Sequence, residues 1–341
     1  MPAAWGYALF ALATALLLAG AAGFAVLGMT RAGGPGLAPL SARLLLAGAW
    51  TYAAAVAALA VHFIQETLQG RVEWHWIVFG PLALAALVAL DVGLYRKLVR
   101  NNLPTWQRFR SYIRREDAEP DAMRRTLVDD VVLHRALWRT SRFRWFRHTL
   151  IFWGFAAMFV LELGAVFLRE AFPAFGWRDV WREARHPVRL AFDFAFDFTG
   201  LMMLAGCLLA LAWRVRVNAT PERKYADTPT TVFLLVVVLT GFVIEGLRIA
   251  PAPGDAQHAA SFVGVGFAHA LSALGIASPA LLQPLWVAHA VAACAFIAYV
   301  PVMRLVHTCA TPLGRLMNSQ KGLLAAKRRG VLGAMLLRQE R

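Results

Sequence analysis

Residues 284–312 have the sequence PLWVAHAVAACAFIAYVPVMRLVHTCATP, and this stretch decides the fold. It predicts one membrane-spanning helix with a histidine near each end, His289 and His307. Their spacing of eighteen residues is five helical turns, so both imidazoles project from one face, about 27 Å apart along the axis. Such a pair suits two redox centres stacked across a bilayer, each completed by a ligand from a facing helix. The plainer alternative is two polar residues tolerated near the helix ends, although ionisable groups in spans are usually functional.

The composition excludes an ordinary soluble domain, since 59% of the 341 residues are hydrophobic and only 16% are charged. Seven apolar runs are long enough to cross a hydrocarbon core, and each must be helical to satisfy its own backbone hydrogen bonds. We therefore expect an all-α integral membrane bundle of about seven transmembrane helices. The runs cover residues 5–29, 41–65, 76–98, 148–168, 190–213, 230–250 and 284–308.

The net charge of +15 is concentrated on one side of this topology, which argues against nucleic acid as its partner. Of the 35 Lys and Arg residues, 28 fall in or beside four segments that share that side, 30–40, 99–147, 214–229 and 309–341. The positive-inside rule makes this side cytoplasmic, with the N-terminus outside and the C-terminus inside. An odd number of spans requires the same arrangement. We expect a multi-pass protein of the cell inner (cytoplasmic) membrane.

The three cysteines, Cys207, Cys294 and Cys309, form no CxxC or CxxCH motif. The sequence therefore predicts no iron–sulfur framework and no covalent c-type haem. Any redox chemistry needs a non-covalent cofactor and a partner.

Further histidines lie at depths that match the last span. His148 stands at the cytoplasmic end of its span, level with His307 on the antiparallel final span, and two histidines at one level are how a bundle holds a b-type haem. His62, near the outer end of its span, lies at nearly the depth of His289. Met158 lies deeper on the helix of His148, where a methionine is more often packing than a ligand.

Two carboxylates mark the predicted outer surface. Asp193 and Asp197 are four residues apart and share a helix face just after Arg189. They can bind a polar headgroup and take up its protons, or be satisfied by neighbouring Arg and Ser/Thr groups. Glu245 and Arg248, three residues apart, are predicted to pair.

The cytoplasmic loop 99–147 carries a predicted amphipathic helix that begins at Pro120 and Asp121. It can lie on anionic headgroups or form a docking surface for a cytoplasmic subunit. One face of this helix is expected to hold Leu127, Val131, His134 and Trp138.

Several signatures resemble two related families of membrane cytochrome b subunits. WxxH at 286–289 followed by RLVH at 304–307 is similar to the last helix of the gamma subunit of respiratory nitrate reductase. FRHTLIFWGF at 146–155, DFTGLMMLAGC at 197–207 and DTPTTVFLLVVVLTGFVIEGLR at 227–248 look closer to the E subunit of heterodisulfide reductase. The resemblance covers roughly residues 76–315.

The resemblance implies a five-helix di-haem core and a set of axial ligands. His148 and His307 match the ligands of the haem nearest the cytoplasm, and His289 matches one ligand of the haem nearest the outer surface. Met158 stands where the nitrate reductase pattern has the fourth ligand, a histidine. A straight helix puts Met158 only about 15 Å from His148, so His62 stays a rival fourth ligand. One or two haem b groups are therefore expected.

The function implied is that of a quinone-reactive membrane subunit of a respiratory oxidoreductase complex. Electrons would pass, through b-type haem, between the quinone/quinol pool and a cytoplasmic iron–sulfur (heterodisulfide reductase-like) or flavoprotein partner. The quinone site is expected around Arg189, Asp193 and Asp197, because Arg189 falls within a residue of a basic position near the outer quinol site of nitrate reductase. The alternatives are a cofactor-free membrane anchor or transporter-like subunit, and a single-haem variant.

Three regions are expected along the chain. Residues 1–75 form two additional N-terminal transmembrane helices, residues 76–315 form the cytochrome b domain, and residues 316–341 form a basic cytoplasmic tail.

Overall fold

The computed structural model describes most of the predicted membrane region in two compact units. The first unit takes residues 63–91 and 140–304, and the second takes residues 2–62, 92–139 and 305–341. All regular secondary structure in the described residues is helical. The described residues are 37–70, 74–100, 125–174, 180–181, 183–216 and 228–302, with the isolated positions 12, 16, 19 and 311.

Six helices in this part of the chain are long and apolar enough to cross a membrane, and the chain is a multi-pass membrane protein. They confirm six of the seven predicted spans, the last of which ends nine residues earlier than predicted. A lone apolar segment in lipid can satisfy its backbone only as a helix. The remaining predicted span, 5–29, falls on residues that are undescribed apart from three isolated positions. The six are Ala47–Leu68, Ile77–Lys97, Arg142–Arg169, Pro187–Arg216, Thr228–Ile249 and Pro279–Tyr299.

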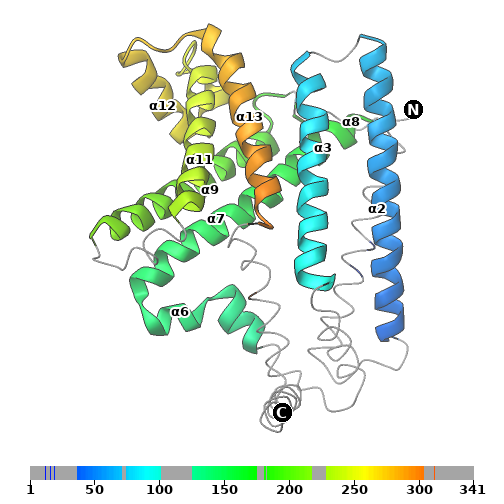
Figure 1. Ribbon diagram of the computed structural model, residues 1–341. Coiled ribbons are helices and arrows are strands. Elements are labelled where there is room, and N and C mark those ends of the chain that lie inside the picture. Colours follow the sequence, from blue (N-terminus) through cyan, green and yellow to red (C-terminus); the bar gives the residue numbers. More distant parts are fainter. Residues whose placement is uncertain are drawn as a thin grey trace. The chain divides into compact units, whose positions relative to one another are not determined.

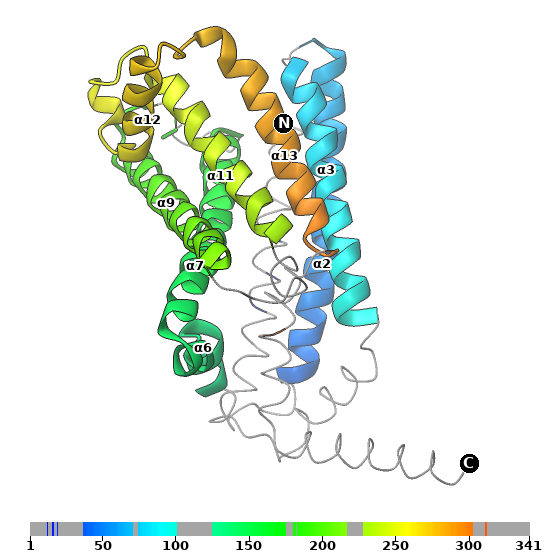
Figure 2. The same ribbon diagram turned by 60° about the vertical axis from the view of Figure 1, so that its left-hand side comes forward.

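The helices of the first unit pack through close approaches at small residues. Its main helices are α3 (Trp74–Leu94), α7 (Arg142–Val166), α9 (Pro187–Arg216), α11 (Thr228–Ile249), α12 (Phe262–Ala273) and α13 (Leu282–Tyr299). In both views α7 runs against α9, while α11 contacts α9, α12 and α13 (Figure 1, Figure 2). A Cβ at Gly154 of α7 would lie 2.8 Å from the Met203 side chain of α9. Such small residues let helix backbones approach closely in a membrane.

An aromatic cluster ties three of these helices together. Phe296 of α13 is buried, with only 3% of its surface exposed. Its ring centroid lies 6.1 Å from that of Phe155 on α7 and 5.3 Å from that of Phe233 on α11. Edge-to-face rings at these distances attract one another in addition to burying apolar area. Phe296 therefore holds α13 against both neighbours.

The last described helix is shorter than its sequence predicts. α13 ends at Tyr299, and residues 300–302 form a turn in which the Val302 N–H donates to the Tyr299 carbonyl. Pro301 has no N–H and its ring clashes with the carbonyl four residues earlier, so it ends the helix. The predicted continuous helix through residue 308 is therefore wrong at this point. His307 lies outside the described residues.

The second unit contains the predicted amphipathic segment in a broken form. The helix η3 (Thr126–Val132) ends two residues before His134, and α6 (Arg135–Thr140) follows it. His134 has a φ of 51°, in the left-handed region that interrupts a right-handed helix. The prediction of a single amphipathic helix is therefore wrong, because the helix is interrupted at His134; its predicted start at Pro120 lies outside the described residues. This unit also holds most of α2 (Leu37–Leu68) and η1 (Tyr95–Val99).

We expect the substitution Gly246→Ala to destabilise the first unit. A Cβ at Gly246 of α11 would lie 2.7 Å from Phe267 Cβ and 3.0 Å from the Phe267 backbone carbonyl carbon on α12. Backbone atoms cannot move aside as a flexible side chain can, so overpacking here is expected to cost about 1–3 kcal/mol. The measurement is the midpoint of thermal unfolding in mild detergent.

Gly266→Ala is the matched control, because a Cβ at Gly266 on α12 meets nothing within 4 Å. This variant should unfold at the wild-type temperature or slightly above it, since alanine favours a helix over glycine. Equal midpoints for the two variants would contradict the close approach of α11 and α12.

Candidate functional site

His289 is held by a neighbouring helix through one of its two ring nitrogens. Its Nδ1 lies 2.8 Å from the Thr240 hydroxyl of α11. That hydroxyl carries one proton and also lies 2.8 Å from the Val236 carbonyl and 3.0 Å from the Val237 carbonyl. When the hydroxyl donates its proton to one of these carbonyls, it accepts from the imidazole. This arrangement favours the tautomer of neutral His289 that carries its proton on Nδ1.

The second nitrogen, Nε2, then carries a lone pair, and within the described residues no hydrogen bond occupies it. Gly241, next to Thr240, lies beside the same ring, where a Cβ would stand 3.4 Å from His289 Cε1 and 4.0 Å from Nε2. Metal-ligating histidines typically donate their other N–H to a protein acceptor, which fixes the tautomer and the ring orientation. His289 therefore has the chemistry of a haem axial ligand.

Of the other predicted ligands, the structure describes the surroundings of His148, Met158 and His62. His148 is half-buried on α7, with its ring stacked on Phe152 at a centroid distance of 6.1 Å. Met158 lies ten residues later on the same unbroken helix, about 15 Å further along the axis. The Thr199 hydroxyl of α9 lies 3.8 Å from the Met158 sulfur. His62 is half-buried on α2. The axial roles of these residues, like that of His307, stay predictions.

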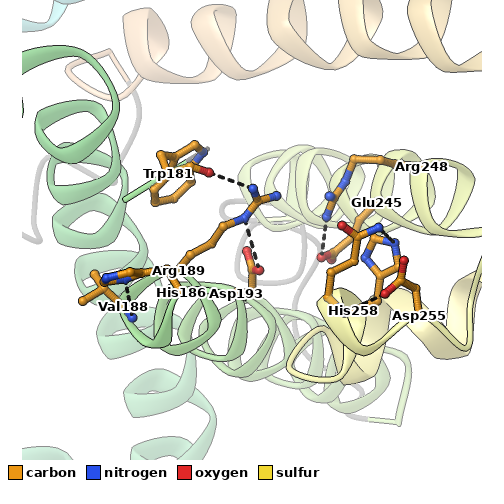
Figure 3. Close-up of polar contacts among 10 residues, drawn as sticks. Trp181, His186, Val188, Arg189, Asp193, Glu245, Arg248, Asp255 and His258 are labelled. Atoms are coloured by element: carbon orange, nitrogen blue, oxygen red, sulfur yellow. Dashed lines mark hydrogen bonds and ion pairs between the residues drawn. The ribbon is translucent and has the colours of Figure 1, made fainter. Parts of the chain in front are cut away.

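The predicted carboxylate region does gather charged side chains, from α9, α11 and the segment before α12. Arg189 Nη1 donates to the Trp181 carbonyl at 2.7 Å, and its Nε lies 3.9 Å from Asp193. Glu245 and Arg248 form the predicted ion pair, at 3.6 Å. Figure 3 shows the two pairs near each other, with His258 and Asp255 beside the second. We call Arg189, Asp193, Asp197, Glu245, Arg248 and His258 the charged cluster.

Asp197 has a different partner from Asp193, although the two were expected to share a face. Only 1% of Asp197 is exposed, and its Oδ2 accepts the N–H of Val263 at 2.6 Å and of Gly264 at 3.3 Å. These N–H groups belong to the first turn of α12, which has no partner for them within the helix. Asp197 therefore caps α12 from another helix, and a carboxylate is well suited to that positive end.

Two residues of this region, His258 and Ser261, belong to no pattern in the sequence that would mark them as part of a site. Both become buried because the loop after α11 folds back and starts α12 against Asp197. The one local signal was Asp255, whose side chain accepts the Gln257 N–H and starts the short helix η5 (Ala256–His258).

We expect acid to weaken the fold partly through His258. Burial and the neighbouring Arg248 guanidinium lower the pKa of His258, and the carboxylates of Asp255 and Asp193 only partly offset this. The unfolded chain then binds a proton at His258 more readily than the folded protein does. The contribution of neutral His258 to the free energy of unfolding is therefore complete above about pH 6.5 and is lost as the pH falls below that value. His258→Gln should make the unfolding midpoint less dependent on pH between about 7.5 and 5.5.

His269→Gln, an exposed histidine on α12, is the matched control and should keep the wild-type pH dependence. The interpretation fails if His258→Gln loses as much stability on acidification as the wild type, in the same detergent and buffer.

Comparison with known proteins links the chain to membrane redox subunits. The E subunit of dihydromethanophenazine:CoB–CoM heterodisulfide reductase from Methanosarcina acetivorans is 28% identical over 195 residues, covering 56% of this chain and 65% of that protein. The E subunit from Methanosarcina mazei is 26% identical over 195 residues, covering 56% and 66%. An EtfAB:quinone oxidoreductase from Syntrophomonas wolfei is 26% identical over 256 residues, covering 71% of this chain and 33% of that protein.

These matches confirm the resemblance to the heterodisulfide reductase E subunit. The chain spans just under two thirds of the length of these relatives and about a third of the S. wolfei protein. No family model and no solved structure matches the chain. The resemblance to the nitrate reductase gamma subunit stays a prediction.

Proposed function

We propose that the chain is a membrane cytochrome b subunit of a respiratory oxidoreductase complex. It would pass electrons between a quinone-type carrier in the membrane and an iron–sulfur or flavoprotein partner on the cytoplasmic side. The names of the E-subunit relatives include dihydromethanophenazine, and the name of the S. wolfei relative includes quinone. We propose that this chain reacts with a membrane carrier of the same kind. The observation that carries the proposal is the imidazole of His289, oriented by Thr240 with Nε2 available.

The axial ligands would come from the predicted histidines. His148 and His307 would hold one b-type haem and His289 a second, with Met158 or His62 as its other ligand. Bound haem supplies reversible one-electron chemistry. The chain itself would orient the His289 imidazole through Thr240 and exclude water through apolar packing such as the Phe155, Phe233 and Phe296 cluster.

The charged cluster would receive the carrier's polar headgroup. Arg189, anchored on the Trp181 carbonyl, can donate to a carrier oxygen, and Asp193 beside it can exchange a proton. Under the predicted inner-membrane orientation the charged cluster faces outward, so protons would be released outside while electrons move toward the cytoplasmic side. Moving one charge against a membrane potential of 100 mV requires about 2.3 kcal/mol.

The basic side would face the partner. Most of the lysines and arginines lie in the segments predicted to be cytoplasmic. A positive surface steers an acidic partner toward the end of the bundle where electrons leave or enter.

Anaerobic mixing of the purified protein with a soluble quinol tests the proposal. We expect the haem absorbance to change to the reduced form with quinol, to the same end point as with dithionite. A protein reduced by dithionite but not by any of several quinols would contradict the quinone-linked function.

A further inference from the structure

One carboxyl group of the charged cluster, which the sequence predicted only to pair with Arg248, is half-buried between two helices. Glu245 lies in the last turn of α11, and its carboxyl packs against the first turn of α12. A Cβ at Gly264 would stand 2.6 Å from Glu245 Cδ and 2.7 Å from Cγ, so only glycine leaves room for this side chain. Just 21% of the Glu245 side chain is exposed.

Two polar side chains face Glu245 without completing their hydrogen bonds. Asp197 and Ser261 are each 1% exposed, and the Glu245 carboxyl is next to both. In the described part of the chain, Asp197 Oδ1 and Ser261 Oγ make no hydrogen bond of ordinary geometry. Buried polar atoms are rarely left so, because an unmade hydrogen bond costs about 1–3 kcal/mol. A proton arriving at Glu245 would give its carboxyl one O–H group, which can donate to Asp197 Oδ1.

The charges around the two carboxyls give them different roles. The other oxygen of Asp197 already accepts hydrogen bonds from two N–H groups of α12. Glu245 has only Arg248, at 3.6 Å and itself 43% exposed. Because two negative charges repel strongly at a site of low polarity, the less supported carboxyl is the one that exchanges a proton.

The position of Glu245 relative to His289 fits a two-electron, two-proton carrier. Glu245 stands one helical turn, about 6 Å along α11, beyond Gly241, which lies beside the His289 ring. The imidazole and the carboxyl therefore both lie beside α11, at positions about one turn apart.

We propose that Glu245, supported by Asp197 and Ser261, is the first proton acceptor for a hydroquinone carrier oxidised at the charged cluster. This rests on the proposed function. Oxidation of one hydroquinone breaks two O–H bonds and releases two electrons. One proton would form a new O–H bond on Glu245 and the other on Asp193, and the b-type haem of the proposed function would supply the one-electron acceptor. The reverse sequence reduces a quinone.

The test compares Glu245→Gln with Glu245→Asp. Haem content and the dithionite-reduced spectrum should match wild type in both. We expect the rate of haem reduction by anaerobic duroquinol to fall about 100-fold in Glu245→Gln, within the range of acid–base catalysis, and less in Glu245→Asp. A second readout is the infrared difference spectrum between quinol- and quinone-treated protein. The carboxylic C=O band that shifts in D₂O should be absent from Glu245→Gln.

Glu162→Gln is the matched control, since Glu162 is an exposed carboxyl on α7 that makes no hydrogen bond or ion pair with the charged cluster in the described residues, and it should leave rate and band unchanged. Gly264→Ala keeps the Glu245 carboxyl but displaces it, so it should also slow reduction. Wild-type rates and an unchanged band in Glu245→Gln would overturn this inference alone. A wild-type protein that binds no haem, or that quinol does not reduce, would refute the proposed function and the inference with it.

Discussion

Replacing His289 by alanine is expected to remove one of two haem groups from the purified protein. The substitution deletes an imidazole whose Nδ1 is fixed 2.8 Å from Thr240 and whose Nε2 is available as a ligand. Under the proposed function, the substitution would remove the bond between the His289 imidazole and the iron of one haem. The measurement is the haem-to-protein ratio, which should fall by about half, together with loss of one component from the reduced-minus-oxidised spectrum.

Two further variants separate ligation from general damage. Thr240→Val keeps the imidazole but removes the hydroxyl, and loss of such an orienting group typically costs 10- to 100-fold in affinity. This variant should therefore bind the same haem more weakly. His269→Ala removes an exposed histidine of α12 and should keep the full haem content. A His289→Ala protein with two haems would show that the ligand assignment is wrong.

Replacing His148 by alanine is also expected to remove a haem, a different one from the haem lost with His289. His148 lies near the start of α7, seven residues before Phe155, whereas His289 lies seven residues before Phe296 on α13. The two imidazoles are therefore each about 10 Å along their helices from the Phe155–Phe296 contact. Loss of His148 should remove a different spectral component from the one lost with His289.

The double variant His148→Ala, His289→Ala should bind no haem, and electron transfer from quinol to a soluble acceptor should stop in His148→Ala. His186→Ala, a loop histidine whose Nδ1 accepts the Val188 N–H, serves as the control. Removal of the same spectral component by both single variants would contradict two separate centres.

Much of the helical architecture follows from local sequence. Apolar runs of about 20 residues can exist in lipid only as helices, so the spans from α2 to α13 were predictable. The Glu245–Arg248 pair was predictable too, because residues three apart on a helix are neighbours. The end of α13 at Tyr299 was available from Pro301 but was missed, because the spacing of His289 and His307 favoured one continuous helix.

Other features depend on contacts between distant residues. The partner of Asp197 is the N–H of Val263, 66 residues later, and no local pattern predicts that a loop will fold back to that depth. The Thr240 contact with His289 spans 49 residues and depends on how α11 and α13 pack. The left-handed backbone of His134 also lacked a signal, since such a conformation is typical of glycine rather than histidine.

The most direct measurement is the optical spectrum of the purified full-length protein, oxidised and then reduced with dithionite, with the haem released and quantified. The account predicts a Soret band that shifts on reduction and a stoichiometry of up to two b-type haems per chain. A protein that is folded and monodisperse in detergent, expressed with ample haem, and yet has no such band would contradict it.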